Sequence, residues 1–134
     1  MSSMKRVRLA VVFLIVAALL AGTPALAGTH NVKLTPTGVE PSASGQARLA
    51  ETTGLYPNFY GHLSVSCKGL TPGATYYFWA TVYRYPYGWT YTWPFIASAT
   101  GTGKADGWIY FTWLGFPVTV KNANGDDVLT GEVW

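Results

Sequence analysis

Aromatic side chains occupy every second position over one stretch of the chain, and they are its most conspicuous chemical feature. The series is Tyr83, Tyr85, Tyr87, Trp89, Tyr91, Trp93 and Phe95, with Tyr77 and Trp79 just upstream. Residues of equal parity on a β-strand point to one side of the sheet, so this spacing predicts one aromatic face. Tyrosine and tryptophan combine a flat apolar ring with a hydrogen-bonding tip, which suits stacking on sugar rings or aromatic compounds.

Three interpretations of this face remain open. It can be the inner wall of a β-protein, where cross-strand aromatic pairs contribute roughly 0.2–1 kcal/mol each. It can be an exposed ligand platform or a contact surface for another protein, because large exposed apolar patches are seldom left uncovered. Both faces of residues 75–85 are apolar, but only one face of a strand can face the core of the domain. The second apolar face favours a functional surface. The candidate ligand-binding residues are therefore Trp79, Tyr83, Tyr85, Tyr87, Trp89, Tyr91 and Trp93.

The other polar residues form no catalytic or metal-binding pattern. The acidic residues after position 28 are Glu40, Glu51, Asp106, Asp126, Asp127 and Glu132, and four of them fall at expected turns or loops. The sequence has no nucleophile elbow, phosphate loop or His-Glu-x-x-His helix. His30, His62 and Cys67 are ligand types of a blue-copper site, but His62 and Cys67 differ in parity along one expected strand. We expect no enzyme, no metal and no cofactor.

The aromatic residues must be positioned by β-strands. After residue 28, short alternating runs recur between clusters of Gly, Pro, Asn and Asp, and no helix-length apolar period is present. We expect strands at residues 30–35, 45–52, 59–67, 75–85, 89–99, 107–114, 117–122 and 128–134. The prediction is one all-β domain over residues 28–134, an Ig-like antiparallel β-sandwich of about eight strands.

Two turns carry signals that would set strand pairing. Asn124-Gly125 suits a two-residue hairpin turn with positive φ at both positions, and a plain turn explains the acidic run there better than a calcium loop does. Residues 85–89 suit a three-residue loop with Gly88 in a left-handed bulge. That loop would place Tyr83 opposite Tyr91 and bring the rings of both strands onto a common face.

Residues 1–27 are expected to be a cleavable signal peptide. Lys5, Arg6 and Arg8 form its basic start, residues 9–21 are apolar, and residues 25–27, Ala-Leu-Ala, supply the cleavage pattern. The apolar run of about 13 residues is short of the ~20 that span a bilayer, although an uncleaved anchor is the alternative. The expected location is secreted or periplasmic, with membrane contact only through the signal peptide during export.

Charge and cysteine content narrow the possible partners. The chain carries a formal charge of +3, from nine basic and six acidic residues, and three of the basic ones lie in the expected leader. The remainder is neutral, so it offers no electrostatic footprint for a nucleic-acid backbone. Cys67 is the only cysteine, which excludes an internal disulfide and favours a buried thiol.

Residues 69–76, Gly-Leu-Thr-Pro-Gly-Ala-Thr-Tyr, resemble the turn and strand entry of fibronectin type III and related Ig-like sandwiches. The resemblance implies that the hydroxyl of Tyr76 bonds back across this corner. Alternation along residues 75–85 places Phe78, Ala80 and Val82 on the inward face with Tyr76, which agrees with the pattern of that family. The chain departs from that family afterwards, because three more strands are expected after the aromatic hairpin.

A broader likeness links the chain to small exported bacterial β-sandwich proteins, including chordin-repeat-like (CHRD) domains, most of which have no assigned function. It runs through residues 32–36, 43–47, 69–73, 103–107 and 128–131. The His-x-His pair of the CHRD pattern has no counterpart, since Tyr77-Phe78-Trp79 occupies that strand. A metal role of that pair therefore does not carry over.

We expect a secreted, non-catalytic binding module that presents the aromatic hairpin to a carbohydrate or another envelope polymer. The alternative is a structural or adhesive envelope protein that self-associates through the same hairpin or by strand addition at a sheet edge. The expected partners are a polysaccharide, another envelope protein or a second copy of the chain.

Overall fold

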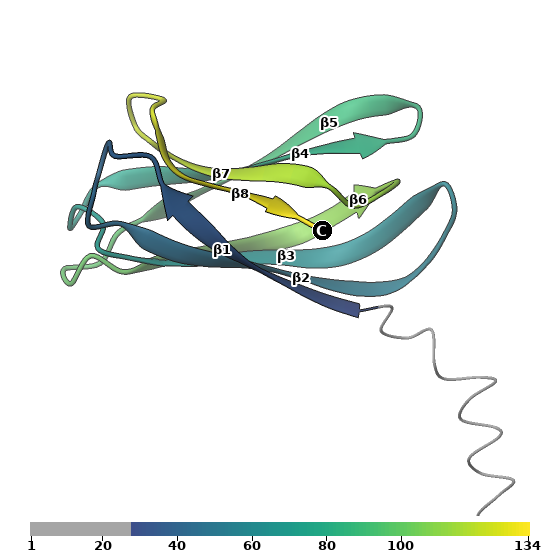
Figure 1. Cartoon of the computed structure of the whole chain (residues 1–134), viewed down its shortest axis with the longest axis horizontal. Helices are drawn as coiled ribbons and strands as arrows, with labels where there is room; N and C mark the ends of the chain where they lie inside the picture. The colour runs from purple at the N-terminus through teal and green to yellow at the C-terminus, as the bar shows by residue number, and fades with distance from the viewer. Residues whose placement is uncertain (1–27) are drawn as a thin grey trace, which may run out of the picture.

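A computed structural model describes residues 28–134, and the expected signal peptide, residues 1–27, lies outside the described residues (Figure 1). Eight strands span this part: β1 (Gly28–Pro36), β2 (Ser44–Leu55), β3 (Asn58–Lys68), β4 (Thr75–Arg84), β5 (Tyr87–Ile96), β6 (Gly103–Phe111), β7 (Phe116–Asn122) and β8 (Asp127–Val133). The predicted all-β class and number of strands are confirmed. Among residues 28–134 no helix has the length and apolar character needed to cross a membrane.

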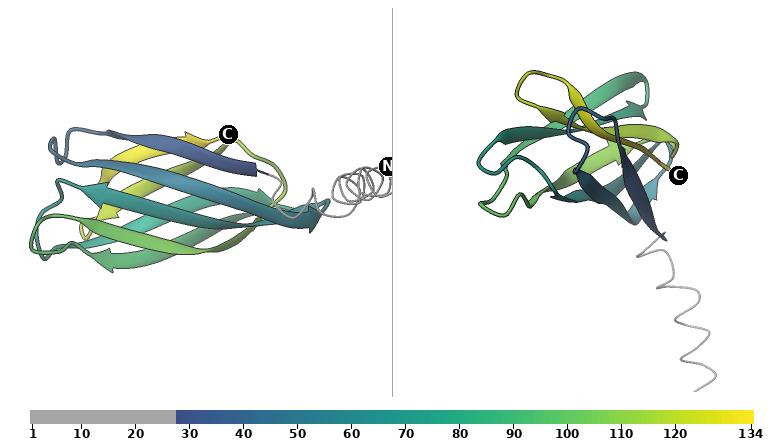
Figure 2. Two further views of the ribbon diagram at one scale, coloured as in Figure 1. Left: turned by 90° about the horizontal axis from the view of Figure 1, so that it is seen from below. Right: turned by 60° about the vertical axis from the view of Figure 1, so that its left-hand side comes forward.

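The strands form one antiparallel sheet in the order β5-β4-β7-β8-β1-β2-β3-β6. Strand β1 joins two halves of this sheet, because Gly28–Leu34 pair with β2 while Thr35 and Pro36 pair with β8. The sheet folds back on itself at this strand (Figures 1 and 2). Its end strands β5 and β6 therefore approach each other along a seam, and the sheet is nearly closed.

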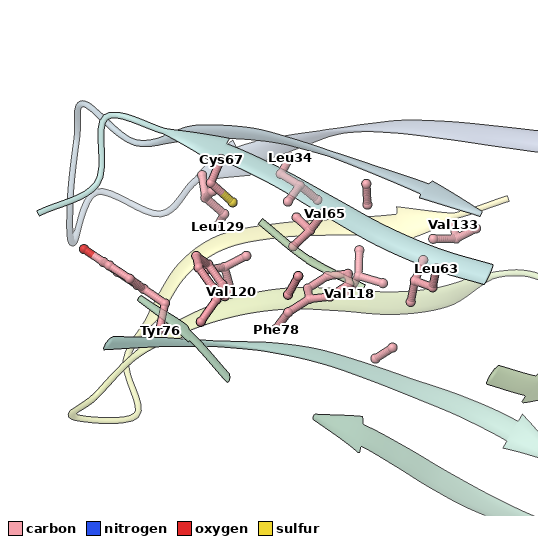
Figure 3. Close-up of a cluster of buried hydrophobic side chains, with 14 of the residues drawn as sticks. Leu34, Leu63, Val65, Cys67, Tyr76, Phe78, Val118, Val120, Leu129 and Val133 are labelled. Atoms are coloured by element: carbon pink, nitrogen blue, oxygen red, sulfur yellow. The ribbon is translucent and has the colours of Figure 1, made fainter. Parts of the chain in front are cut away.

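The core lies between the two halves of the sheet and consists of alternate strand residues (Figure 3). On β4, Tyr76, Phe78, Ala80 and Val82 are all at most 2% exposed, as the alternation predicted. Cys67 lies in the same cluster and is 4% exposed, so the expected buried thiol is confirmed. Burial raises the pKa of this thiol from 9.0 to about 12.

The corner before β4 has the bond that the Ig-like resemblance implied. The backbone N–H of Thr71 donates to the Tyr76 hydroxyl at 2.9 Å, and that hydroxyl donates to Glu40 Oε1 at 2.6 Å. Burial, and then the bond to Glu40, raises the pKa of the Tyr76 hydroxyl. The corner therefore fastens the loop before β2 to the start of β4.

Strand β6 begins four residues earlier than predicted, at Gly103 rather than Gly107, and ends at Phe111. Its Gly103-Lys104-Ala105-Asp106-Gly107 start has turn-like composition, which placed it outside the predicted strand. The glycines have a packing role instead, because a Cβ at Gly103 would meet the Phe95 ring at 2.6 Å and one at Gly107 would collide with the Trp93 indole. Strand β5, predicted to end at residue 99, ends at Ile96.

The predicted pairing of the aromatic hairpin is wrong. The chain turns over two residues, Tyr85 and Pro86, which are joined by a cis peptide bond, and Gly88 pairs with Tyr83 inside the ladder. This register shift changes the parity of every cross-strand pair, and a change of parity moves side chains to the opposite face. The odd-numbered rings of β5 therefore share a face with the even-numbered residues of β4, and the expected common aromatic face does not form.

The turn between β7 and β8 also differs from the prediction. Four residues separate Asn122 from Asp127, and only Gly125 there has a positive φ, of 84°. The side-chain oxygen of Asn122 accepts the backbone N–H groups of Asn124 and Asp126, each at 3.0 Å. These bonds stabilise a longer loop, so Asn124 does not need the left-handed conformation.

Candidate functional site

Two of the predicted site residues, Tyr91 and Trp93, lie half-buried along the seam between β5 and β6. The Tyr91 hydroxyl accepts a hydrogen bond from the backbone N–H of Tyr110 at 3.0 Å. The Trp93 ring covers Gly107 and lies 5.7 Å from the Phe78 ring. Tyr91 and Trp93 are themselves stacked at 5.7 Å with an interplanar angle of 6°. Both residues contact the core and the edge of β6.

Trp79 lies on the opposite, outer face of the hairpin. The Lys121 ammonium stands 5.4 Å from the centre of its ring. Its indole Nε1 is buried and has no hydrogen-bond partner within residues 28–134. Beside it lies a depression of about 350 Å³ that Tyr77 and Thr92 also line. Trp79 is therefore separated from the rings of β5 by the thickness of the sheet.

Tyr83 stacks on Trp113 just beyond the end of β6, with ring centroids 4.6 Å apart and an interplanar angle of 14°. Trp113 keeps 58% of its surface exposed, so Tyr83 supports a ring that remains accessible. Thr112 fastens the hairpin here: its N–H donates to the Tyr83 carbonyl and its Oγ1 accepts the Tyr85 N–H, both at 2.7 Å.

The tip of the hairpin is the most exposed part of the predicted site. Tyr85, Tyr87 and Trp89 are 54%, 75% and 51% exposed. The Arg84 guanidinium lies 5.3 Å from the Trp89 ring and 5.0 Å from the Tyr110 ring, so it links β5 to β6 across the seam. Cation–π contacts of this kind hold a ring in place and leave part of it exposed.

A second group of rings, which the sequence reasoning missed, stands on the outer face of β3 and β6. We call Tyr60, His62, Trp108 and Tyr110 the aromatic ladder. Tyr60 stacks on Trp108 at 4.9 Å and 9° and contacts Tyr110 at 4.7 Å, while His62 packs on Trp108 at 4.9 Å. The alternation of these residues within each strand was visible, but the pairing of β3 with β6, which are distant in sequence, was not.

All the exposed tyrosines and tryptophans of residues 28–134 gather in one half of the molecule. We call this group the aromatic end: Tyr56, Tyr85, Tyr87, Trp89, Trp108, Tyr110, Trp113 and Trp134. Antiparallel registers bring them together, since Phe59 pairs with Phe111 and Phe116 with Val133. In Figure 2 the start of β1, the C-terminus and the β2–β3 hairpin lie at this end.

Two histidine–carboxylate pairs are found among the described residues. His30 Nε2 lies 3.0 Å from Glu51 Oε2 and its Nδ1 lies 2.6 Å from the main-chain oxygen of Trp134. His62 Nε2 lies 2.7 Å from Asp106 Oδ2. Neither imidazole bonds a Ser, Thr or Cys side chain in this part of the chain. His62 is half-buried on the outer face and Cys67 is inside, as their parity predicted.

The metal-ligand types are not assembled into a centre. Within residues 28–134 no group of three or more His, Cys, Asp or Glu side chains is placed to hold a metal ion. His30 lies at the aromatic end, where its ring nitrogens contact Glu51 and Trp134. What the arrangement offers chemically is therefore a set of fixed, partly exposed rings.

Comparison with known proteins returns no matching family model, no similar curated protein and no similar solved structure.

Proposed function

We propose that the chain is a secreted or periplasmic, non-catalytic binding module that recognises a glycan of the cell envelope through the aromatic end. The observation that carries the proposal is the gathering of all exposed Tyr and Trp side chains of residues 28–134 in one half of the molecule. A protein that used these rings only for packing would have no need to concentrate the exposed ones.

The contacts of individual rings support stacking on a flat ligand. Trp113 rests on Tyr83, Trp108 rests on Tyr60, and Trp89 rests against Arg84, yet each is more than half exposed. Rings that are already ordered lose little conformational entropy when a sugar stacks on them. The expected hairpin contributes Tyr85, Tyr87 and Trp89, and the ladder and Trp113 extend the surface beyond it.

An Ig-like sandwich related to small exported bacterial domains is part of this proposal. The Tyr76 corner and its bond to Thr71 support it, as does the basic-then-apolar composition of residues 1–27. Export would expose the aromatic end to envelope polymers rather than to cytoplasmic partners.

Retention on insoluble envelope polysaccharide tests the proposal. Wild type is compared with a Trp89→Ala, Trp108→Ala double variant, and with Val39→Ala as the matched control. Val39 is 49% exposed and lies in the loop between β1 and β2, outside the aromatic end. We expect wild type and the control to be retained alike and the double variant to lose most of its retention. Equal retention of all three folded proteins would exclude the aromatic end as the binding surface.

Self-association through the same rings is the second candidate, because a large exposed apolar patch is also what a subunit contact requires. Strand addition at β6 has less support than ring contact. Two N–H groups there are already used, that of Tyr110 by Tyr91 and that of Thr112 by Tyr83. Sedimentation across a hundredfold concentration range separates the two functions, since only self-association makes the mass concentration-dependent.

A further inference from the structure

We propose that the bound polymer is acidic, and that its carboxylate or phosphate groups bind a basic groove on the outer face of β1, β2, β3 and β6. The inference rests on the proposed function and adds the charge class of the ligand. The groove has a volume of about 950 Å³. Its lining includes Lys33, Lys68 and Lys104, with Gln46 and Ser66 between them.

The strand register places these cations on one side of the sheet. Lys33 pairs with Gln46, Gln46 with Ser66, and Ser66 with Lys104, which gives one row across four strands. Directly paired residues point to the same face. Because neighbouring strands lie about 4.8 Å apart, the row sets the backbones of Lys33 and Lys104 about 14 Å apart. Lys68 is two residues beyond Ser66 and so shares the face.

The chain's acidic groups are used elsewhere. Each acidic side chain of residues 28–134 bonds another group: Glu40 with Tyr76, Glu51 with His30, Asp106 with His62, Asp126 with Asn122, Asp127 with Lys121 and Glu132 with Trp134. None of them lines the groove. In this part of the chain no ion pair includes Lys33, Lys68 or Lys104. Residues 28–134, which contain six basic and six acidic residues, therefore present a local positive surface.

The aromatic ladder stands on the same face of the sheet as these lysines, farther along β3 and β6. Along β6, Lys104, Asp106, Trp108 and Tyr110 are all exposed and alternate with inward residues. Trp108 is four residues from Lys104, which is about 13 Å along an extended strand. The intervening acid, Asp106, is bonded to His62. One extended polymer can thus stack sugar rings on the ladder and place acid groups near the lysines.

Binding of the full chain to soluble polymers tests the charge class. The probes are polygalacturonate for carboxylates, poly(glycerol phosphate) for phosphates, dextran as a neutral glycan and a single-stranded DNA oligonucleotide. We expect tight binding to one or both acidic non-nucleic polymers, weakening as salt is added. Because each exposed lysine contact is of modest strength, we expect a Lys33→Gln, Lys68→Gln, Lys104→Gln variant to lose about tenfold in affinity.

The matched control is Lys121→Gln, which also removes one positive charge but on β7 and outside the groove. It should bind like wild type, whereas Lys33→Gln or Lys104→Gln alone should weaken binding. Equal affinity for dextran and the acidic polymers would overturn the charge inference and leave the glycan-binding function standing. If wild type bound none of the polymers, the proposed glycan-binding function would be overturned. Tighter binding to DNA than to the glycans would overturn both.

Discussion

The Tyr91 hydroxyl accepts the backbone N–H of Tyr110 at 3.0 Å, so a side chain of β5 occupies a hydrogen-bonding position on the free edge of β6. Sheet edges with unpaired N–H groups invite pairing with other chains. Here the two end strands do not pair through backbone hydrogen bonds. Side-chain rings and hydroxyls of β5 cover part of the β6 edge instead. The aromatic residues of β5 therefore hold the fold closed as well as surround the candidate surface.

Removing this hydroxyl should weaken the closure. We expect Tyr91→Phe to lower the free energy of unfolding by about 0.5–1.5 kcal/mol, because the Tyr110 N–H loses its partner at a partly solvated site. Urea unfolding measures the change. Tyr87→Phe is the control, since Tyr87 is 75% exposed and its hydroxyl has no hydrogen bond within the described residues. Equal stabilities for the two variants would argue against a role for the bond.

The glycine under Trp93 should not tolerate a side chain. We expect Gly107→Ala to destabilise the protein by about 1–3 kcal/mol, because its Cβ collides with the Trp93 indole and the seam must open. Gly88→Ala is the matched control, since a Cβ there meets nothing within 4 Å. It should change stability by less than about 0.5 kcal/mol. Thermal unfolding measures both stabilities. Equal melting temperatures for the two variants would contradict the packing of Trp93 on Gly107.

Thr112 links the hairpin to the end of β6, and its hydroxyl can be tested separately from its volume. Thr112→Val leaves the Tyr85 N–H without its acceptor at a residue that is 3% exposed. We expect a loss of about 1–3 kcal/mol and faster hydrogen exchange at the Tyr85 amide. Thr90→Val, on an exposed part of β5, should have little effect on either measurement. Unchanged exchange at Tyr85 would contradict this bond.

Fluorescence quenching should separate two tryptophans that the sequence placed together. Trp89 is 51% exposed, whereas Trp93 is half-buried against Gly107. We expect Trp89→Phe to reduce the fraction of emission that iodide quenches and Trp93→Phe to increase it. The opposite order would mean that Trp93, not Trp89, faces the solvent.

Stability should fall at alkaline pH because of Cys67. The folded thiol has a pKa of about 12, raised by burial from 9.0. Below pH 9 both states keep the proton, so the contribution is fully present. Between pH 9 and 12 the unfolded chain releases the proton first, so the free energy of unfolding falls by up to about 1.4 kcal/mol per pH unit.

Cys67→Ala removes this contribution, so its loss of stability between pH 8.5 and 10.5 should be smaller than that of wild type by about 1–2 kcal/mol. The raised pKa of Tyr76 acts in the same direction above pH 10 in both proteins and cancels in the comparison. Parallel pH profiles from urea unfolding would contradict a protonated, buried thiol.

Local patterns predicted the strands well because alternation and turn residues are local signals. The inward face of β4 follows from alternation within one strand, and the bond from the Thr71 N–H to the Tyr76 hydroxyl was implied by the Ig-like resemblance of residues 69–76. The hairpin pairing was missed because Pro86 and Gly88 permit more than one loop length, and a change of parity reverses the faces. Gly103 was assigned to a turn rather than to β6. The glycines of β6 are needed because the rings of Phe95 and Trp93 pack directly on them, and those rings belong to another strand.

The candidate site was only half predictable for a related reason. Tyr85, Tyr87 and Trp89 were found because they belong to one hairpin. The aromatic ladder depends on the pairing of Tyr60 with Tyr110, which are 50 positions apart. Their strands, β3 and β6, are neighbours in the sheet but not in the sequence. The groove lysines come from three strands, so their proximity emerges only when the sheet order is known.

Both ends of the described chain lie beside the aromatic rings, since His30 near the start of β1 bonds the main-chain oxygen of Trp134. A bulky group attached next to Gly28 or Trp134 would crowd the very region where a sugar is to stack. The loop holding Gly125 lies at the far end of β7 and β8. Labels, surface-coupling groups and reporter insertions are therefore best placed there, where they leave the rings unobstructed.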